Sequence, residues 1–215
     1  MTALSMTKFG HACIRVTDGE TTVVVDPGMF TEPEALDGAT AVLVTHDHGD
    51  HLAVDRVREA LDRQAGLQIW CNDAVAAAVG GATARVHVVG NGDAFSVGGI
   101  GVTVHGEWHE VVHPDIPRAK NVGFLLGGAV FHPGDAFTLP GVPVAALLLP
   151  VHAPWSRIAG VIDYARAVAP GAAYAAHDSF LSEAGLAITD RLLSEGGPGI
   201  GTAYARLRPG QTVTV

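Results

Sequence analysis

The chain has 215 residues and a formal net charge of −9; 48% of its residues are hydrophobic and 16% are charged. This length suits one domain, residues 1–215, with a substantial core, and the composition is too apolar for a disordered chain. The acidic balance disfavours binding to a nucleic-acid backbone, and the apolar runs are too short to span a bilayer. The start lacks a secretory signal pattern and the sequence has two cysteines, Cys13 and Cys71, which favours a cytoplasmic location.

The first half of the chain is predicted to form strands followed by helices. Apolar β-like runs bounded by turn residues predict strands at 3–9, 12–17, 21–28, 41–45 and 67–71. Apolar residues at helical spacing predict helices at 53–66 and 72–81. Gly66 is the expected end of the first helix, and Asn72 or Asp73 is the expected N-cap of the second.

The second half repeats this plan. Strands are predicted at 99–108, 121–126, 129–135, 144–149, 172–177, 202–207 and 211–215. Helices are predicted at 156–171, with Ser156 as the cap, and at 182–197. Two strand-then-helix halves predict an α+β protein with two sheets packed face to face and helices on the outer faces.

Several buried strands end in a residue that can bind a metal. The residues at these ends are His46, His109, Asp135 and His177. A rigid sheet fixes the end of each strand, while the rim of the sheet stays accessible to a substrate. The sequence therefore predicts a metal site built from the ends of strands that are distant along the chain.

The stretch THDHGDHL, residues 45–52, gathers ligand-type side chains within one turn. His46 and His48 are two residues apart and would share a face in an extended segment, and Gly49 would allow a sharp turn. That turn would bring Asp50 and His51 close to a second cation. Imidazole and carboxylate ligands together suit Zn, Fe or Mn.

The residues alone leave some of these assignments open. Asp135 lies in a Pro-Gly-Asp sequence that is also a common turn, and His177 could be a core histidine. His105 has the same strand parity as His109, and His113 lies just beyond, so periodicity does not choose among the three.

The sequence resembles a known family at several of these points. THDHGDHL matches the H-x-H-x-D-H signature of metallo-β-lactamase-fold hydrolases. The opening FGHACIRV, with VVVDPG after it, is similar to the branch that contains ascorbate-6-phosphate lactonase-like proteins. The resemblance covers nearly the whole chain and implies a four-layer αββα sandwich.

The same resemblance implies a ligand set for two divalent metal ions. It assigns the first metal to His46, His48 and His109, which favours His109 over its two neighbours. It assigns the second metal to Asp50, His51 and His177, and it assigns Asp135 as the carboxylate that bridges both metals.

Other polar residues are expected around these ligands. Asp26 is expected to orient a ligating histidine. The pocket is expected to include His113, His152 and Trp155, although His152 and Trp155 could equally pack a loop onto the next helix. His11 and His132 have no assigned chemistry, and each could be structural.

The leading hypothesis is a dinuclear metal-dependent hydrolase that cleaves an ester, lactone or phosphodiester bond of a small molecule with a metal-bound hydroxide. Zinc is the expected metal, with Mn or Fe as alternatives, and Asp50 is expected to relay a proton. We expect a small-molecule substrate, no nucleic acid and no membrane, and a homo-oligomer stays open. The rival hypothesis is a non-enzymatic metal-binding or regulatory protein with the same fold.

Overall fold

The computed structural model describes residues 3–81 and 83–215, which form two seven-stranded sheets. The first sheet has the order β14-β1-β2-β3-β4-β5-β6, with bounds β1 (Ser5–Lys8), β2 (Ile14–Thr17), β3 (Thr22–Val25), β4 (Ala41–Val44), β5 (Gln68–Cys71), β6 (Val86–Val88) and β14 (Thr212–Thr214). The second has the order β13-β12-β11-β10-β9-β8-β7, with bounds β7 (Ala94–Val97), β8 (Ile100–His105), β9 (Gly123–Leu126), β10 (Val130–His132), β11 (Ala146–Pro150), β12 (Ala172–Ala176) and β13 (Ala203–Ala205).

Both sheets are mixed and share one plan. In the first sheet the pairs from β14 to β3 are antiparallel, and the pairs from β3 to β6 are parallel. In the second sheet the pairs from β7 to β10 are antiparallel, and those from β10 to β13 are parallel. This repetition confirms that the second half of the chain has the same organisation as the first.

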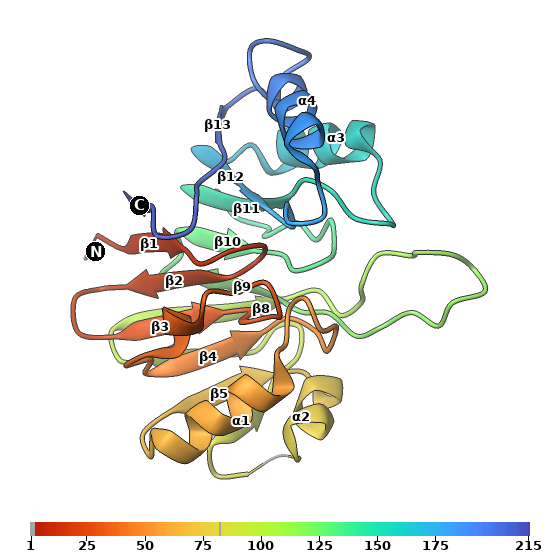
Figure 1. The fold of residues 1–215 in the computed structure, drawn as a ribbon. Helices are drawn as coiled ribbons and strands as arrows, with labels where there is room; N and C mark the ends of the chain where they lie inside the picture. Colours follow the sequence, from red (N-terminus) through yellow and green to blue (C-terminus); the bar gives the residue numbers. More distant parts are fainter. Residues whose placement is uncertain (1–2, 82) are drawn as a thin grey trace.

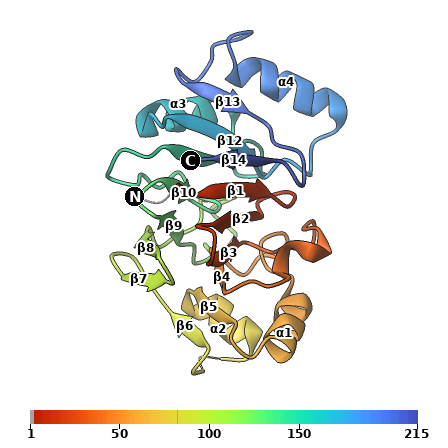
Figure 2. The same cartoon turned by 90° about the vertical axis from the view of Figure 1, so that its left-hand side faces the viewer.

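Helices cover the outer face of each sheet (Figure 1). The helices α1 (Val54–Arg63) and α2 (Asp73–Val79) pack on the first sheet, and α3 (Ile158–Val168) and α4 (Glu183–Leu193) pack on the second. The view in Figure 2 shows the same two helical layers at opposite ends of the molecule. A third apolar core fills the space between the sheets, with Val25 and Leu43 on one side and Phe124 and Leu148 on the other. The predicted αββα sandwich is therefore confirmed.

Strand β4 has apolar side chains on both faces of the first sheet, so both faces must be covered. All of its residues are buried: Leu43 packs into the core between the sheets, and Val42 and Val44 pack beneath α1 and α2. A continuous apolar run of this kind is typical of a strand covered on both faces. None of the helices in the described part of the chain is long and apolar enough to cross a membrane.

Some predicted boundaries were wrong. Strand β8 ends at His105, because the chain turns at Gly106 with a φ of 75°, rather than continuing to residue 108. Helix α1 ends at Arg63, before Gly66. The N-cap of α3 is Arg157, because the Ser156 hydroxyl binds the backbone of Ala153 instead.

Two short strands were not predicted, and one helix cap was. Strands β6 and β7 lie at the sheet edges and are largely exposed, so they lack the apolar pattern that reveals an inner strand. The short 3-10 helix at Pro33–Leu36 was also missed. The Asn72 side chain accepts a hydrogen bond from the Val75 amide, which confirms the predicted cap of α2.

The strand directions explain how distant residues meet. Strands β1, β3 and β4 run the same way in the first sheet, and β8, β10 and β12 run the same way in the second. The carboxyl ends of each set therefore lie at one edge of their sheet, where the polar segments of the sequence follow.

Candidate metal centre

The structure brings the seven predicted ligands into one cluster at this edge. Ligand atoms lie within 4.8 Å of one another in three groups: His46, His48 and His109; His46, His51 and Asp135; and His11, Asp50, His51 and His177. The first group is the ligand set expected for one metal. The third contains the set expected for the other, together with His11, to which the sequence assigned no chemistry.

Asp135 lies between the two sets. Its Oδ1 is 3.2 Å from His51 Nε2, and its Oδ2 is 3.4 Å from His109 Nε2 and 3.1 Å from His177 Nε2. These histidines come from both sheets, so the carboxylate of Asp135 is positioned to serve both sets. Its place matches the bridging position that the family resemblance implied.

Asp26 orients two of the histidines, His51 directly and His46 through Thr45. His51 Nδ1 lies 2.7 Å from Asp26 Oδ2, and the Thr45 hydroxyl donates to the same oxygen at 2.7 Å. Because that hydroxyl hydrogen is used by Asp26, the Thr45 oxygen accepts from His46 Nδ1 at 2.9 Å. His46 therefore carries its proton on Nδ1, with its Nε2 lone pair facing the cluster, and the neutral form of His51 has the same arrangement.

Four buried atoms of the cluster residues have no hydrogen-bond partner among the described residues. They are His51 Nε2, His109 Nε2, His177 Nδ1 and Asp135 Oδ1. His109 Nδ1 donates to the Glu110 carbonyl at 2.6 Å, so its Nε2 also carries a lone pair. When the rings are neutral, the Nε2 lone pairs of His51 and His109 and the Asp135 oxygen converge without a donor, which is costly, and a cation would satisfy them. The residues present therefore fit a metal.

Burial and nearby charges give the histidines of the cluster different protonation states. Burial lowers the pKa of His46 well below its usual value and also lowers that of His48, which keeps both imidazoles neutral and able to bind a cation. Burial opposes the charged form of His177 as well, but hydrogen bonds to Asp135 and Asp50 raise its pKa to about 9. Carboxylates similarly raise the pKa of His51 well above its usual value.

His11 completes the cluster in a different role. The Ser179 amide donates to His11 Nδ1 at 3.2 Å, so the neutral ring carries its proton on Nε2. That Nε2 lies 3.3 Å from Asp50 Oδ2 and donates to it. Although Nε2 is close enough to share a cation with its neighbours, this tautomer makes His11 a residue that positions Asp50. Burial lowers the pKa of His11 to about 4, which keeps it neutral.

The backbone is strained at three of these positions. His11, Asp26 and His177 have φ values of 47°, 51° and 59°, in the left-handed region that residues other than glycine seldom adopt. Such strain gathers at sites where the surrounding structure fixes the geometry for function. The strain is a signal that the sequence pattern does not carry.

Buried polar residues join the two sheets beside the cluster. Lys8 of β1 is 2% exposed, and its ammonium donates to the His11 carbonyl and, at 2.7 Å, to the Ala175 carbonyl of β12. His132 at the end of β10 donates from Nε2 to the Ala12 carbonyl at 2.8 Å. These hydrogen bonds connect the two sheets, and His132 contacts the backbone of the facing sheet.

The residues expected to line the pocket lie in different places. Trp155 Nε1 donates to Asp135 Oδ2 at 3.0 Å, so Trp155 lies against the cluster. His113 has an exposed side chain that contacts Asp115, outside the cluster, and His152 is half-buried in the loop before Trp155. His105 is not among the clustered residues, and its Nε2 lies 2.8 Å from Thr103 Oγ1.

The expected role of Gly49 was wrong. Its φ is not in the positive region, and a Cβ there would meet nothing within 4 Å. The turn instead rests on amides of His51 and Leu52, which both donate to the His48 carbonyl. The glycine that the loop does need is Gly28, because a Cβ there would lie 1.8 Å from the Asp50 carbonyl oxygen.

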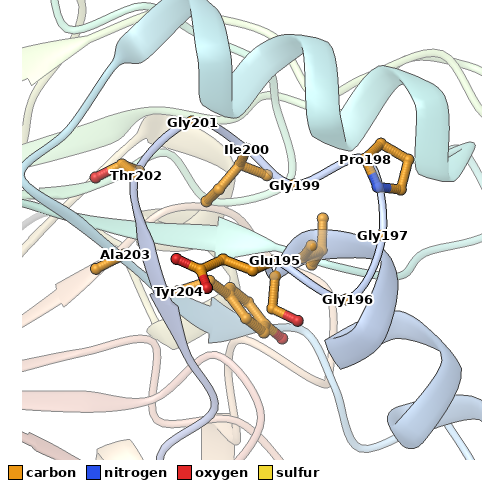
Figure 3. A pocket seen from close by; sticks show the side chains of 12 residues that line it. Glu195, Gly196, Gly197, Pro198, Gly199, Ile200, Gly201, Thr202, Ala203 and Tyr204 are labelled. Carbon is orange, nitrogen blue, oxygen red and sulfur yellow. The ribbon is translucent and has the colours of Figure 1, made fainter.

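A separate pocket lies away from the cluster, in the loop between α4 and β13 (Figure 3). The segment from Leu193 to Tyr204 forms its walls, and most of that wall is the backbone of a glycine-rich turn. The phenol of Tyr204 already donates to Asp190 at 2.8 Å. The pocket gathers no set of ligand-type side chains, so the chemistry is assigned to the histidine cluster.

Comparison with known proteins agrees with this geometry. Residues 5–177 match the family described as "Beta-lactamase superfamily domain". The chain belongs to the β-lactamase superfamily. The resemblance seen in the sequence is thereby confirmed at the level of the superfamily, while the ascorbate-6-phosphate lactonase-like branch stays a prediction.

Individual members of the β-lactamase superfamily show the same relationship. The chain is 35% identical over 185 residues to Protein Rv0786c of Mycobacterium tuberculosis, covering 83% of this chain and 86% of that one. It is 29% identical over 143 residues to a UPF0173 metal-dependent hydrolase of Xanthobacter autotrophicus, covering 61% and 58%. The crystal structure of the metallo-β-lactamase fold protein YhfI from Bacillus subtilis superposes with a TM-score of 0.69 at 13% identity, covering 99% and 100%.

Proposed function

We propose that this chain is a dinuclear metal-dependent hydrolase that cleaves an ester or lactone bond of a small molecule. The observation that carries the proposal is the convergence of the orphaned atoms His51 Nε2, His109 Nε2 and Asp135 Oδ1 in a buried cluster. Relatives such as the Xanthobacter protein carry the name metal-dependent hydrolase, which supports the same activity. The proposal treats residues 1–215 as one domain.

The ligand sets divide between two metals. His46, His48 and His109 would hold one, and Asp50, His51 and His177 would hold the other, with Asp135 between them. When bound, a pair of divalent ions lowers the pKa of water to near neutrality and polarises the substrate oxygen. Zinc suits the mixed imidazole and carboxylate donors, with Mn and Fe as alternatives.

The residues of this chain orient the reaction and handle the proton. His11 and His177 both place a ring nitrogen within 3.3 Å of Asp50 Oδ2, which fixes the carboxylate and lowers its pKa despite its partial burial. Asp50 is partly buried, and its lowered pKa keeps it ionised, so its carboxylate would accept a hydrogen bond from the attacking water and pass the proton on rather than hold it. Trp155 holds Asp135 and covers one side of the cluster.

A screen of the metal-reconstituted protein tests the proposal. Lactones and carboxylic esters should be hydrolysed, and penicillins and cephalosporins should show negligible turnover. The same screen should include phosphodiesters, thioesters and a long RNA, because efficient cleavage of β-lactams or RNA would contradict the assignment. If the protein binds two metals but hydrolyses none of these substrates, the alternative of a non-enzymatic metal-binding or regulatory protein gains support.

A further inference from the structure

Exposed apolar side chains line one side of the metal centre. Val111, Val112 and Ile116 are 52%, 41% and 53% exposed, on the long loop between β8 and β9 that projects from the body of the protein in Figure 1. All three line a small pocket that also includes His48 and His109. Apolar surface is therefore continuous with the proposed ligands of the first metal.

The opposite side of the centre is also apolar. Phe180 is 52% exposed, and its ring centroid lies 5.2 Å from that of His11 and 5.6 Å from that of His177. Met29 is 60% exposed, and its amide donates to the Gly49 carbonyl in the loop of residues 46–51, called the metal loop below. Exposed apolar groups that gather around a polar site are typical of a ligand-binding surface.

The charges in this pocket do not favour a polyanionic substrate. Arg118 and Glu110 belong to the pocket lining, but Arg118 Nε donates to the His109 carbonyl, and Glu110 Oε1 accepts from the Phe137 amide at 3.1 Å. Asp47, in the metal loop itself, is exposed. Recognition of a phosphate group usually employs several guanidinium or ammonium groups, and this surface offers one arginine beside the carboxylates of Glu110 and Asp47, so a neutral apolar substituent fits it better.

We infer that the substrate carries an apolar acyl chain, which lies against Val111, Val112 and Ile116 while its ester or lactone group reaches the metal centre. This inference rests on the proposed hydrolase function and narrows its substrate class to medium-chain esters or lactones. Removing apolar surface from water favours binding in proportion to the area buried, so each methylene in contact adds to the affinity.

Two pairs of substrates test the inference with the metal-reconstituted protein. The pairs are γ-butyrolactone with γ-decalactone and p-nitrophenyl acetate with p-nitrophenyl octanoate, each rate normalised to that of hydroxide alone. The longer substrate of each pair should have a kcat/KM at least about tenfold higher, because several methylenes gain apolar contact. The double variant V111S/I116S should reduce this preference about threefold or more. Ile188→Ser, which changes an equally exposed apolar residue on α4, should leave it unchanged.

A binding measurement separates failure of the inference from failure of the function. Octanamide and acetamide are not readily hydrolysed, and calorimetry with the reconstituted protein should show binding of octanamide that V111S/I116S weakens and Ile188→Ser does not. Equal rates for short and long substrates, or a preference for short phosphorylated esters, would overturn the inference while the hydrolase function stands. Selective octanamide binding without hydrolysis of any ester or lactone would instead overturn the proposed function.

Discussion

At the scale of single residues, the third imidazole of the first metal set is the assignment that the sequence left open. His109 is 2% exposed with an orphaned Nε2, whereas His105 contacts Thr103 and His113 contacts Asp115. His109→Ala should therefore abolish hydrolysis and remove close to one metal per chain. His105→Ala and His113→Ala should retain the wild-type metal content. Elemental analysis after reconstitution measures this, and loss of metal from either control but not from His109→Ala would refute the assignment.

Asp26 is the residue whose loss should affect both metal sets without removing a ligand. Asp26→Ala leaves the Thr45 amide and hydroxyl without their buried acceptor and frees the rings of His46 and His51. Each unsatisfied buried group costs about 1–3 kcal/mol of stability, and loss of such an orienting carboxylate typically lowers metal affinity about 10–100-fold.

Competition with a zinc chelator and thermal unfolding together measure the effect of Asp26→Ala. Asp55→Ala, on the exposed side of α1, is the matched control and should change neither quantity. Thr45→Val breaks the connection to His46 but keeps the one to His51, so it should weaken the first metal set more than the second. An Asp26→Ala protein with wild-type zinc affinity would show that these hydrogen bonds do not fix the ligands.

At the scale of elements, the metal loop depends on its contact with the loop after β3. Gly28 lies so close to Asp50 that a Cβ would overlap the Asp50 carbonyl, and the Met29 and Ala53 amides tie the two loops together. Gly28→Ala should push residues 46–51 away and lower zinc affinity about tenfold or more, together with activity. Gly49→Ala lies in the same loop with open space around its Cβ, and it should bind zinc almost normally. Equal effects of the two substitutions would exclude the proposed overlap.

The comparison of elements shows what the sequence pattern can and cannot reveal. Inner strands such as β4 were predicted because a run buried on both faces is continuously apolar. Edge strands such as β6 and β7 were missed because each has only one buried residue and its pattern resembles a loop. The end of β8 was misplaced because His105 and the residues after it continue the alternation, while the turn depends on the backbone of Gly106.

The same limit applies to the site. The H-x-H-x-D-H motif is local in sequence, so it predicts a cluster directly, and the remaining candidates follow from the ends of inner strands. The role of His11 depends on the Ser179 amide, 168 residues away, and on a left-handed backbone conformation. Neither of these features leaves a pattern in the sequence near His11, so only the three-dimensional structure distinguishes it from an ordinary turn residue.

At the scale of the whole molecule, the candidate centre joins the two sheets. His46, His48, Asp50 and His51 follow a strand of the first sheet, whereas the other proposed ligands, His109, Asp135 and His177, follow strands of the second. A metal bound by both sets would cross-link the halves of the sandwich, and the unfolded chain has no such site. Metal binding should therefore stabilise the native state, by about 2.7 kcal/mol when free metal is 100 times its Kd.

This linkage gives the protein a pH-dependent metal affinity with a definite sign. A metal binds a deprotonated imidazole, but carboxylates raise the pKa of His177 to about 9 and that of His51 well above its usual value. Below pH 9 the incoming metal must displace a proton from His177, so affinity is low in acid and rises as the pH approaches that pKa. His46, whose pKa burial lowers, has no proton to displace in this range.

The apparent zinc association constant should rise about tenfold per pH unit for each proton displaced, and so by about one to two powers of ten per unit between pH 6.5 and 8.5. Competition against a chelator of known proton affinity measures it, and the zinc-induced shift in Tm should increase over the same range. His177→Ala should weaken binding overall and also reduce the slope by about one, because one proton is no longer released. A pH-independent association constant would mean that neither His177 nor His51 gives up a proton to the metal, and would contradict the raised pKa values of both rings.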